Sequence, residues 1–222
     1  MFGYTILGFG SGGEKKEYSM QFYVVAGGGG ANAARGGGAG GGGSRASTQS
    51  LFTGDTLNIT VGAGGTGQPS FPGPSANKGS PSSIGGGTVP ADFVTITSTG
   101  GGQSQAQGGA AGGAAFPTNN QIAGNEGGFS PPEGGDGGAG GAPGQAGTAN
   151  KGGGGGAGFD PGSPPYPGGG AGGSGVVIVR APADSFPVIS VTGGSNTKGQ
   201  TPAPDGAATL LTFNETGTIV VG

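Results

Sequence analysis

Four carboxylates, Glu126, Glu133, Asp136 and Asp160, lie within one glycine-rich region and are the first candidates for chemistry in this sequence. A pair of carboxyl groups can act as general acid and base, and several converging oxygens can hold calcium. Their spacing matches no EF-type loop, and the chain contains neither histidine nor cysteine. Those two residues supply most general bases, nucleophiles and transition-metal ligands. We therefore expect no enzyme, no metal site and no cofactor, and we interpret the carboxylates as solubilising charges.

The stretch GFGSGG at residues 8–13 matches the G-x-G-x-x-G pattern of dinucleotide-binding loops. That pattern has meaning only between a strand and a helix, with an acidic residue about twenty positions later. No such context surrounds this stretch, and 63 of the 222 residues are glycine, so chance matches are expected. The motif is better explained as a flexible segment or one that docks on another surface.

Charge and hydropathy exclude two classes of partner. The chain has 8 Lys plus Arg and a net charge of -3, without a basic stripe that could neutralise phosphates, so we expect no nucleic acid. No apolar run approaches the roughly 18 residues of a membrane-spanning helix, so we expect no membrane insertion.

The elements that must position any site are predicted to be strands. Short runs rich in Val, Ile, Thr, Phe and Tyr end in Gly or Pro, and nothing has the pattern of a helix. The runs lie at 20–26, 56–62, 92–98, 175–181, 187–192, 208–213 and 217–221. The run VVIVR is continuously apolar and predicts a strand covered on both faces, whereas TLNITV and DFVTITS alternate as half-buried antiparallel strands do. We predict an all-β fold, an antiparallel β-sandwich with long glycine-rich insertions.

The insertions need a structure of their own, because long structureless loops are uncommon inside compact domains. Gly135, Gly138, Gly141, Gly144 and Gly147 recur every third residue, which is the repeat of the polyproline II helix. Helices of this type can pair their backbones side by side only where glycine removes the Cβ atoms between them. We therefore predict that the insertions pack as polyglycine II-type helices.

Four phrases resemble, in the same order, sequences of glycine-rich tail-fibre and adhesin proteins of tailed bacteriophages. They are YVVAGGGG (23–30), LNITVGAGGTG (57–67), GSPSSIGGG with VTITSTGGG (79–102) and GGAGGSGVVIVRAP (169–182). The resemblance implies a virion tail component that displays loops to a receptor on the host surface. The closing phrase LLTFNETGTIVVG resembles one that precedes the YVVAGGGG strand in such proteins. Its place here suggests that the last strand pairs beside residues 23–26, or that a second repeat is truncated.

Aromatic residues beside proline mark the breaks between glycine tracts. They are Phe71, Phe116, Phe129, Phe159 and Tyr166, and the amides Asn119 and Asn120 follow the second of them. Proline stiffens a turn, and a rigid aromatic ring can stack on a sugar or fill a pocket. We predict these residues as receptor-binding. The alternative is that the rings cap the ends of the glycine bundle and cover its backbone.

The N-terminal residues Phe2, Tyr4, Ile6, Leu7 and Phe9 form an apolar, aromatic patch that needs burial. We predict a virion-docking segment at 1–19, although an edge strand of the same sheet is an alternative. A glycine-rich β domain would follow at 20–183, and strands closing the sheet at 184–222.

These expectations combine into one functional hypothesis. The chain would be a phage tail fibre or adhesin subunit of the virion, assembled in the host cytoplasm as a homotrimer. It would bind a host surface polysaccharide or lipopolysaccharide without cleaving it, and would contact other tail or baseplate proteins. The alternatives are a glycine-rich assembly protein that only bridges tail or baseplate components, and an ice-binding or cell-wall protein.

Overall fold

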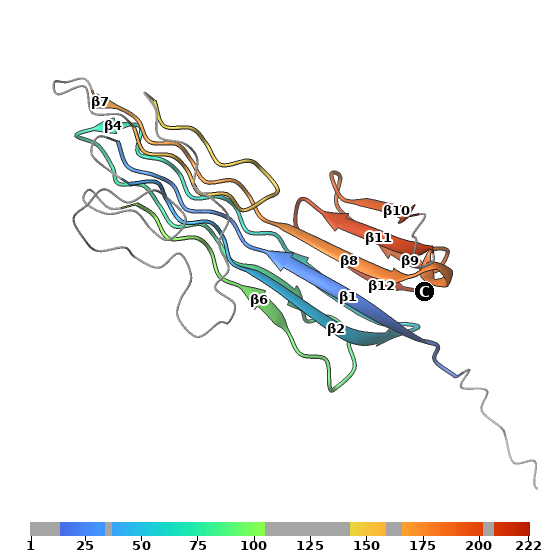
Figure 1. Cartoon of the computed structure of the whole chain (residues 1–222). Coiled ribbons are helices and arrows are strands. Elements are labelled where there is room, and N and C mark those ends of the chain that lie inside the picture. Colours follow the sequence, from blue (N-terminus) through green and yellow to red (C-terminus); the bar gives the residue numbers. More distant parts are fainter. Residues whose placement is uncertain (1–13, 34–36, 105–142, 159–165, 202–206) are drawn as a thin grey trace, which may run out of the picture.

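A computed structural model describes residues 14–33, 37–104, 143–158, 166–201 and 207–222. The described chain has two parts, a strand sandwich and a bundle of extended glycine-rich segments that continues from the strand ends (Figure 1). The strands are β1 (Glu17–Val25), β2 (Ser44–Phe52), β3 (Thr56–Thr60), β4 (Ser70–Phe71), β5 (Ser82–Gly85), β6 (Ile96–Ser98), β7 (Tyr166–Pro167), β8 (Val176–Pro182), β9 (Ile189–Val191), β10 (Thr197–Thr201), β11 (Ala208–Phe213) and β12 (Gly217–Val221). A single 3-10 turn, Ala183–Ser185, is the only helical element in these ranges.

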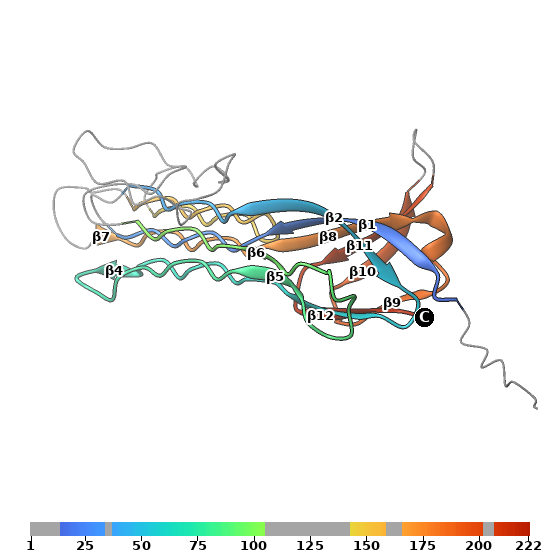
Figure 2. The same cartoon turned by 90° about the horizontal axis from the view of Figure 1, so that it is seen from below.

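Two five-stranded sheets form the sandwich, and every strand pair in them is antiparallel. The first sheet has the order β10-β11-β8-β1-β2 and the second has the order β6-β5-β3-β12-β9. The all-β fold with antiparallel sheets that the sequence predicts is therefore confirmed. Figure 2 shows the two sheets stacked one above the other, with β1, β2 and β8 in the upper layer and β5, β9 and β12 in the lower one.

Alternating side chains of β1 build the core between the sheets. Tyr18, Met20, Phe22 and Val24 are buried, whereas the residues between them are exposed. Phe22 packs edge to face on Phe93, with ring centroids 5.9 Å apart. Burial of one such ring stabilises the fold by about 2 kcal/mol. The largest other fully buried side chains are Leu51, Leu57, Ile59, Ile84, Ile189, Leu211, Phe213 and Ile219.

Two of the strand predictions differ from the structure, and several strands were not predicted. In β8, Ile178 and Arg180 are only half-buried, so VVIVR is covered on one face and not on both. The reason is that each sheet of a two-layer sandwich packs against the other sheet on one face only. In the run at 92–98, only Ile96–Ser98 forms a strand, and Val94 is exposed. The polar strands β2, β5 and β10 were not predicted, since their Ser, Thr, Gln and Lys residues lack an apolar alternation.

The last strand also lies elsewhere than expected. β12 pairs with β3 and β9 in the second sheet, whereas β1 pairs with β2 and β8 in the first. The prediction that the last strand lies beside residues 23–26 is wrong, because those positions are already occupied on both sides. The strand boundaries also cross the expected domain limits: β1 begins at Glu17, inside 1–19, and strands from 184–222 contribute to both sheets.

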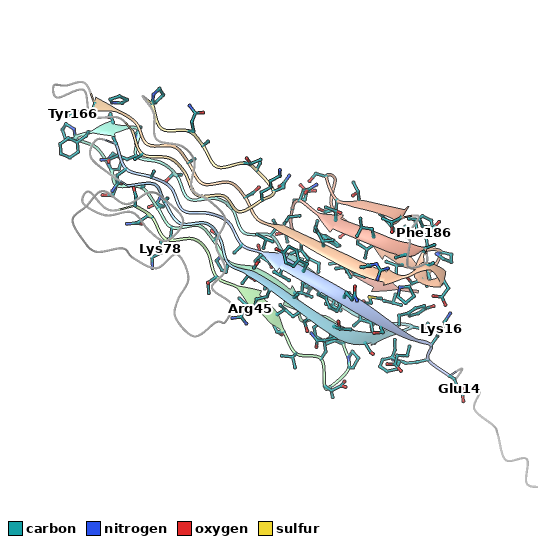
Figure 3. The ribbon with its side chains drawn as sticks, viewed as in Figure 1. Glu14, Lys16, Arg45, Lys78, Tyr166 and Phe186 are labelled. Atoms are coloured by element: carbon teal, nitrogen blue, oxygen red, sulfur yellow. The ribbon has the colours of Figure 1, made fainter. Side chains whose placement is uncertain are left out.

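The two described ends of the chain lie together at the sandwich end of the molecule. Glu14, Lys16 and Phe186 lie at that end, and Tyr166 lies at the opposite one (Figure 3). The C-terminus is also at the sandwich end, and the short strands β4 and β7 mark the far end of the glycine bundle (Figures 1 and 2). The fold therefore presents β4 and β7 at a distance from both described ends.

Candidate functional site

Among the described residues, the glycine bundle consists of eight stretches that leave the sandwich or return to it. They are residues 26–33, 39–43, 62–68, 76–80, 99–104, 143–148, 152–158 and 168–175. The first of these, residues 26–33, continues directly from β1 and is completely buried; we call it the central segment.

Backbone donors of the central segment point to three neighbours in rotation. Ala26 and Gly29 donate to Gly43 and Gly40, respectively. Gly27 and Gly30 donate to Ser80 and Asn77, and Gly28 and Ala31 donate to Gly173 and Gly170. All six distances are 2.9 to 3.0 Å. Each partner number falls by three as the donor number rises by three, so these neighbours run antiparallel to the central segment. A rotation of three residues per turn is the repeat expected of a polyglycine II-type helix, the conformation that we predict for these segments.

Backbone acceptors of the central segment follow the same rotation with three other neighbours. Gly27 and Gly30 accept from Gly101 and Ser104, Gly28 and Ala31 from Gly65 and Gln68, and Gly29 and Asn32 from Gly155 and Gly158. Here the partner numbers rise together, so these neighbours run parallel. The central segment is thus surrounded by six others, and its backbone groups find partners without any β-sheet.

Glycine is required in this packing by close approach. A Cβ atom built on Gly27, Gly28, Gly29 or Gly30 would overlap the backbone of Ala63, Gly153, Gly102 or Thr66, respectively. None of these four glycines has a positive φ. A side chain is therefore excluded by the lack of space and not by the backbone conformation. The bundle is therefore held by backbone hydrogen bonds, which side chains would separate.

Serine hydroxyls close the bundle where it meets the sandwich. Ser82 Oγ donates to the Val25 carbonyl oxygen and accepts from the Gly62 N–H, both at 2.8 Å. Ser98 Oγ donates to the Val24 carbonyl oxygen at 2.8 Å. Both serines are fully buried. They satisfy backbone groups at the point where sheet pairing changes into bundle pairing, and we call them the serine clamp.

Buried amides close the central segment at its other end. Asn32 Oδ1 accepts from the Ala76 N–H at 2.8 Å, and Asn32 Nδ2 donates to the Ser104 carbonyl oxygen at 2.7 Å. Gln68 Oε1 accepts from the Ala33 N–H at 2.9 Å, and Gln68 Nε2 donates to the Gly73 carbonyl oxygen at 3.0 Å. These two side chains tie the loop at residues 69–76 to the bundle, which fixes the base of the adjacent tip.

Two of the residues predicted to bind a receptor meet at the tip of the bundle. Phe71 of β4 pairs with Tyr166 of β7, and their ring centroids lie 5.8 Å apart at an interplanar angle of 70°. Phe71 is 51% exposed, and Tyr166 is half-buried. The peptide bond between Phe71 and Pro72 is cis. Although 95 residues separate Phe71 from Tyr166 in the sequence, the structure makes one aromatic surface of them.

The other predicted site residues lie outside the described residues. These are Phe116, Asn119, Asn120, Phe129 and Phe159, the docking residues Phe2, Tyr4, Ile6, Leu7 and Phe9, and the carboxylates Glu126, Glu133, Asp136 and Asp160. Within the described ranges, no group of three or more Asp or Glu residues could hold a metal ion. In the same ranges no helix is long and apolar enough to cross a membrane.

Three titratable groups with a shifted pKa lie in the sandwich. The hydrogen bond between Lys16 and Asp184 raises the pKa of the lysine and lowers the pKa of the carboxyl. Glu215 accepts from the Ser195 N–H at 3.0 Å, which lowers the pKa of its carboxyl. These exposed groups hold chain ends and loops of the sandwich together and do not face the aromatic tip.

The buried polar residues of the bundle were not predicted from the sequence. Asn32 and Gln68 each closely follow a glycine tract, and this position is the only signal that could have identified them, whereas Ser82 has no such signal. Their partners lie on other segments of the bundle, so their role depends on which segments become neighbours.

The comparisons with known proteins identify a domain family. The sequence model of the glycine-rich domain family matches residues 14–182, which include β1 to β8 and all eight stretches of the bundle. No curated protein and no solved structure matches the chain. Since the match spans more than half of the chain, this protein belongs to the glycine-rich domain family.

Proposed function

We propose that this chain is a tail fibre or adhesin subunit of a tailed bacteriophage and binds a host surface saccharide with the tip of its glycine bundle. The observation that carries the proposal is the Phe71–Tyr166 pair on strands β4 and β7. Aromatic rings stack on the apolar faces of sugar rings and lose little conformational entropy when they do so. The expected ligand is a host polysaccharide or lipopolysaccharide.

Support for a binding role comes from the rigidity of the base beneath the tip. The buried amides of Asn32 and Gln68 tie the neighbouring loop to the bundle, and the bundle itself is joined by backbone hydrogen bonds. A preorganised surface loses less entropy on binding than a mobile loop does. The aromatic surface can therefore bind as a fixed platform.

The described chain ends and the aromatic tip lie at opposite ends of the molecule, which fits attachment at one end and recognition at the other. Glu14 and the C-terminus lie at the sandwich end, and β4 and β7 lie at the far end (Figures 1 and 3). In this proposal residues 1–19 dock the subunit on other tail or baseplate proteins, and the tip projects from the virion. Three copies would assemble around a common axis, as closed symmetry is the rule among homo-oligomers.

Binding without cleavage is part of the proposal, and two features of the sequence support it. The chain has no histidine or cysteine to act as base or nucleophile, and the carboxylates that a glycosidase would use show no catalytic spacing. Phe71 and Tyr166 provide contact surface and one hydroxyl group, which suit recognition and not hydrolysis. The assigned role is therefore that of a lectin-like adhesin.

The test uses the full chain, immobilised on a sensor surface, against a panel of purified bacterial lipopolysaccharides and capsular polysaccharides. We expect at least one preparation to bind, and Phe71→Ala and Tyr166→Ala each to weaken that binding about 5- to 100-fold, the range of a hot-spot ring. Val94→Ala is the control, because Val94 is an exposed hydrophobic side chain of the sandwich. Strong binding to isolated tail or baseplate proteins, with none to the saccharide panel, would instead favour the assembly role.

A further inference from the structure

A concave surface lies at the root of the bundle, on the outer face of the first sheet. It is a groove of about 330 Å³ lined by Tyr23, Val25, Ser44, Asn150, Lys151 and Val176, and we call it the root groove. Its floor is formed where β1 meets its two partners, since Val25 lies opposite both Val176 and Ser44. The turn at residues 149–152 forms its wall on the bundle side.

Tyr23 supplies an aromatic surface to the root groove. Its side chain points away from the core and is 44% exposed, although β1 is an inner strand of the sheet. Its cross-strand neighbours are Ala46 and Ile178. Because Ala46 has only a methyl group, it leaves one side of the tyrosine ring uncovered. An exposed aromatic ring beside a hollow is the arrangement that stacks on a planar or ring-shaped ligand.

The turn that carries Lys151 is held in place by hydrogen bonds to two neighbouring stretches, through Ser174 and Gly42. Asn150 has a φ of 59°. Its Oδ1 accepts a hydrogen bond from Ser174 Oγ, and its N–H donates to Ser174 Oγ, both at 2.9 Å. Gly152 donates to the Ser174 carbonyl oxygen at 2.9 Å and accepts from the Gly42 N–H at 2.7 Å. Lys151 therefore presents an exposed ammonium group from a fixed backbone.

The chemistry of the lining selects an anionic ligand with hydroxyl groups. Lys151 brings a positive charge, Ser44 a hydroxyl and Asn150 an amide, and no lining residue is acidic. Tyr23, Val25 and Val176 add an aromatic and aliphatic surface. We propose that the root groove binds a sugar ring that carries an acidic group, with the ring stacked on Tyr23 and the carboxylate or phosphate beside Lys151. This site is separate from the aromatic tip, so the inference stands whether or not the tip binds a saccharide.

The experiment is a titration of the isotopically labelled full chain, followed by NMR. The probes are trigalacturonic acid, which carries carboxylates, mannose 6-phosphate, which carries a phosphate, and neutral maltotriose. We expect one of the acidic probes to bind at millimolar concentration or below and to shift the signals of Tyr23, Lys151 and their neighbours. The acidic probe that binds distinguishes a uronic-acid polysaccharide from a phosphorylated lipopolysaccharide core.

Matched variants locate the binding. Tyr23→Ala and Lys151→Gln are each expected to weaken it about tenfold, while Tyr23→Phe and Lys151→Arg retain most of it, because they keep the ring and the charge. Tyr166→Ala at the tip leaves it unchanged. Neither Tyr23 nor Lys151 is in the core, and an unchanged Tm confirms that each variant is folded. Binding of neither acidic probe, equal affinity for maltotriose, or unchanged affinity in Tyr23→Ala and Lys151→Gln overturns the proposal.

Discussion

The N–H of Gly28 donates to the carbonyl oxygen of Gly173 at 2.9 Å, although these glycines belong to the first and last stretches of the bundle. On another side of Gly28, the Gly153 backbone fills the space that a Cβ atom would take. One residue thus contacts two other stretches, each of which lies more than a hundred positions away from it in the sequence. The glycines of the described bundle provide contact surfaces between its stretches, whereas in most proteins glycines serve turns.

The first prediction concerns this contact. Gly28→Ala should destabilise the protein by at least about 3 kcal/mol, the upper end of overpacking costs, because the obstructing atoms are backbone and cannot rotate away. Thermal or urea unfolding of the purified variant measures the change.

A matched control separates steric overlap from the general effect of losing a glycine. Gly199 lies in the edge strand β10, and a Cβ atom built on it meets nothing within 4 Å. Gly199→Ala should therefore change the free energy of unfolding by less than about 0.5 kcal/mol. Equal effects of the two substitutions would contradict the close packing around Gly28.

The glycine spacing predicts extended helices that pack side by side, but it does not predict which stretches of the bundle become neighbours. The three-residue spacing at 135–147 indicates extended helices, and the strand patterns of β1, β3, β8, β11 and β12 indicate their sandwich base. The central segment, however, contains four consecutive glycines, so its sequence does not indicate which residue faces which neighbouring stretch. Its six neighbours are selected by where the strands end, and a local pattern cannot encode those long-range positions.

The second prediction concerns the serine clamp at the junction of sandwich and bundle. Ser82→Ala removes one hydroxyl and leaves both the Gly62 N–H and the Val25 carbonyl oxygen without this partner. Buried polar groups that lose a partner cost about 1 to 3 kcal/mol, so unfolding should become easier by that amount. Ser83→Ala is the matched control, because Ser83 is the next residue of β5 and is only half-buried. A loss in Ser83→Ala as large as that in Ser82→Ala would contradict the clamp.

The third prediction addresses the order and helix type of the bundle. Amide hydrogens of Gly28, Gly29 and Gly30 should exchange as slowly as those of β1, since all three donate to backbone acceptors inside the bundle. Their φ angles, measured from NMR couplings and chemical shifts, should lie near the polyproline II value of about -75°. Exchange at the rate of an unfolded peptide would contradict the ordered bundle, and sheet-like angles would contradict the helix type.

The fourth prediction is a pH dependence that arises from Glu215. Its hydrogen bond from the Ser195 N–H lowers the pKa of the folded carboxyl below its ordinary value of 4.5. A lowered pKa in the folded state stabilises the protein above the ordinary pKa, and this contribution disappears as the pH falls through the folded value. Glu215→Gln should therefore lose less stability than the wild type between about pH 6 and pH 3. A parallel loss in both proteins would show that this hydrogen bond does not contribute.

The sequence predicts the two aromatic residues of the proposed site but not that they lie side by side. Phe71 and Tyr166 were identified because each aromatic residue lies beside proline at a break in the glycine tracts. Their pairing could not be identified, because it requires the stretches at 62–68 and 168–175 to be neighbours. Gly65 and Gln68 accept from Gly172 and Gly169, and these backbone bonds bring the two rings together. The aromatic surface that we propose for recognition is therefore a consequence of glycine packing.

The last prediction distinguishes recognition by the tip from capping of the bundle. If the rings bind a saccharide, Phe71→Ala and Tyr166→Ala should each weaken binding by about 1 to 3 kcal/mol while Tm stays nearly unchanged, because exposed rings contribute to an interface and little to the core. The double variant should lose less than the sum of the two single losses, since rings 5.8 Å apart act as one surface. Saccharide binding and thermal unfolding of all four proteins are measured in the same buffer. A fall in Tm that accounts for the loss of binding would instead show that the pair covers the end of the bundle, and saccharide recognition would then have to depend on other residues.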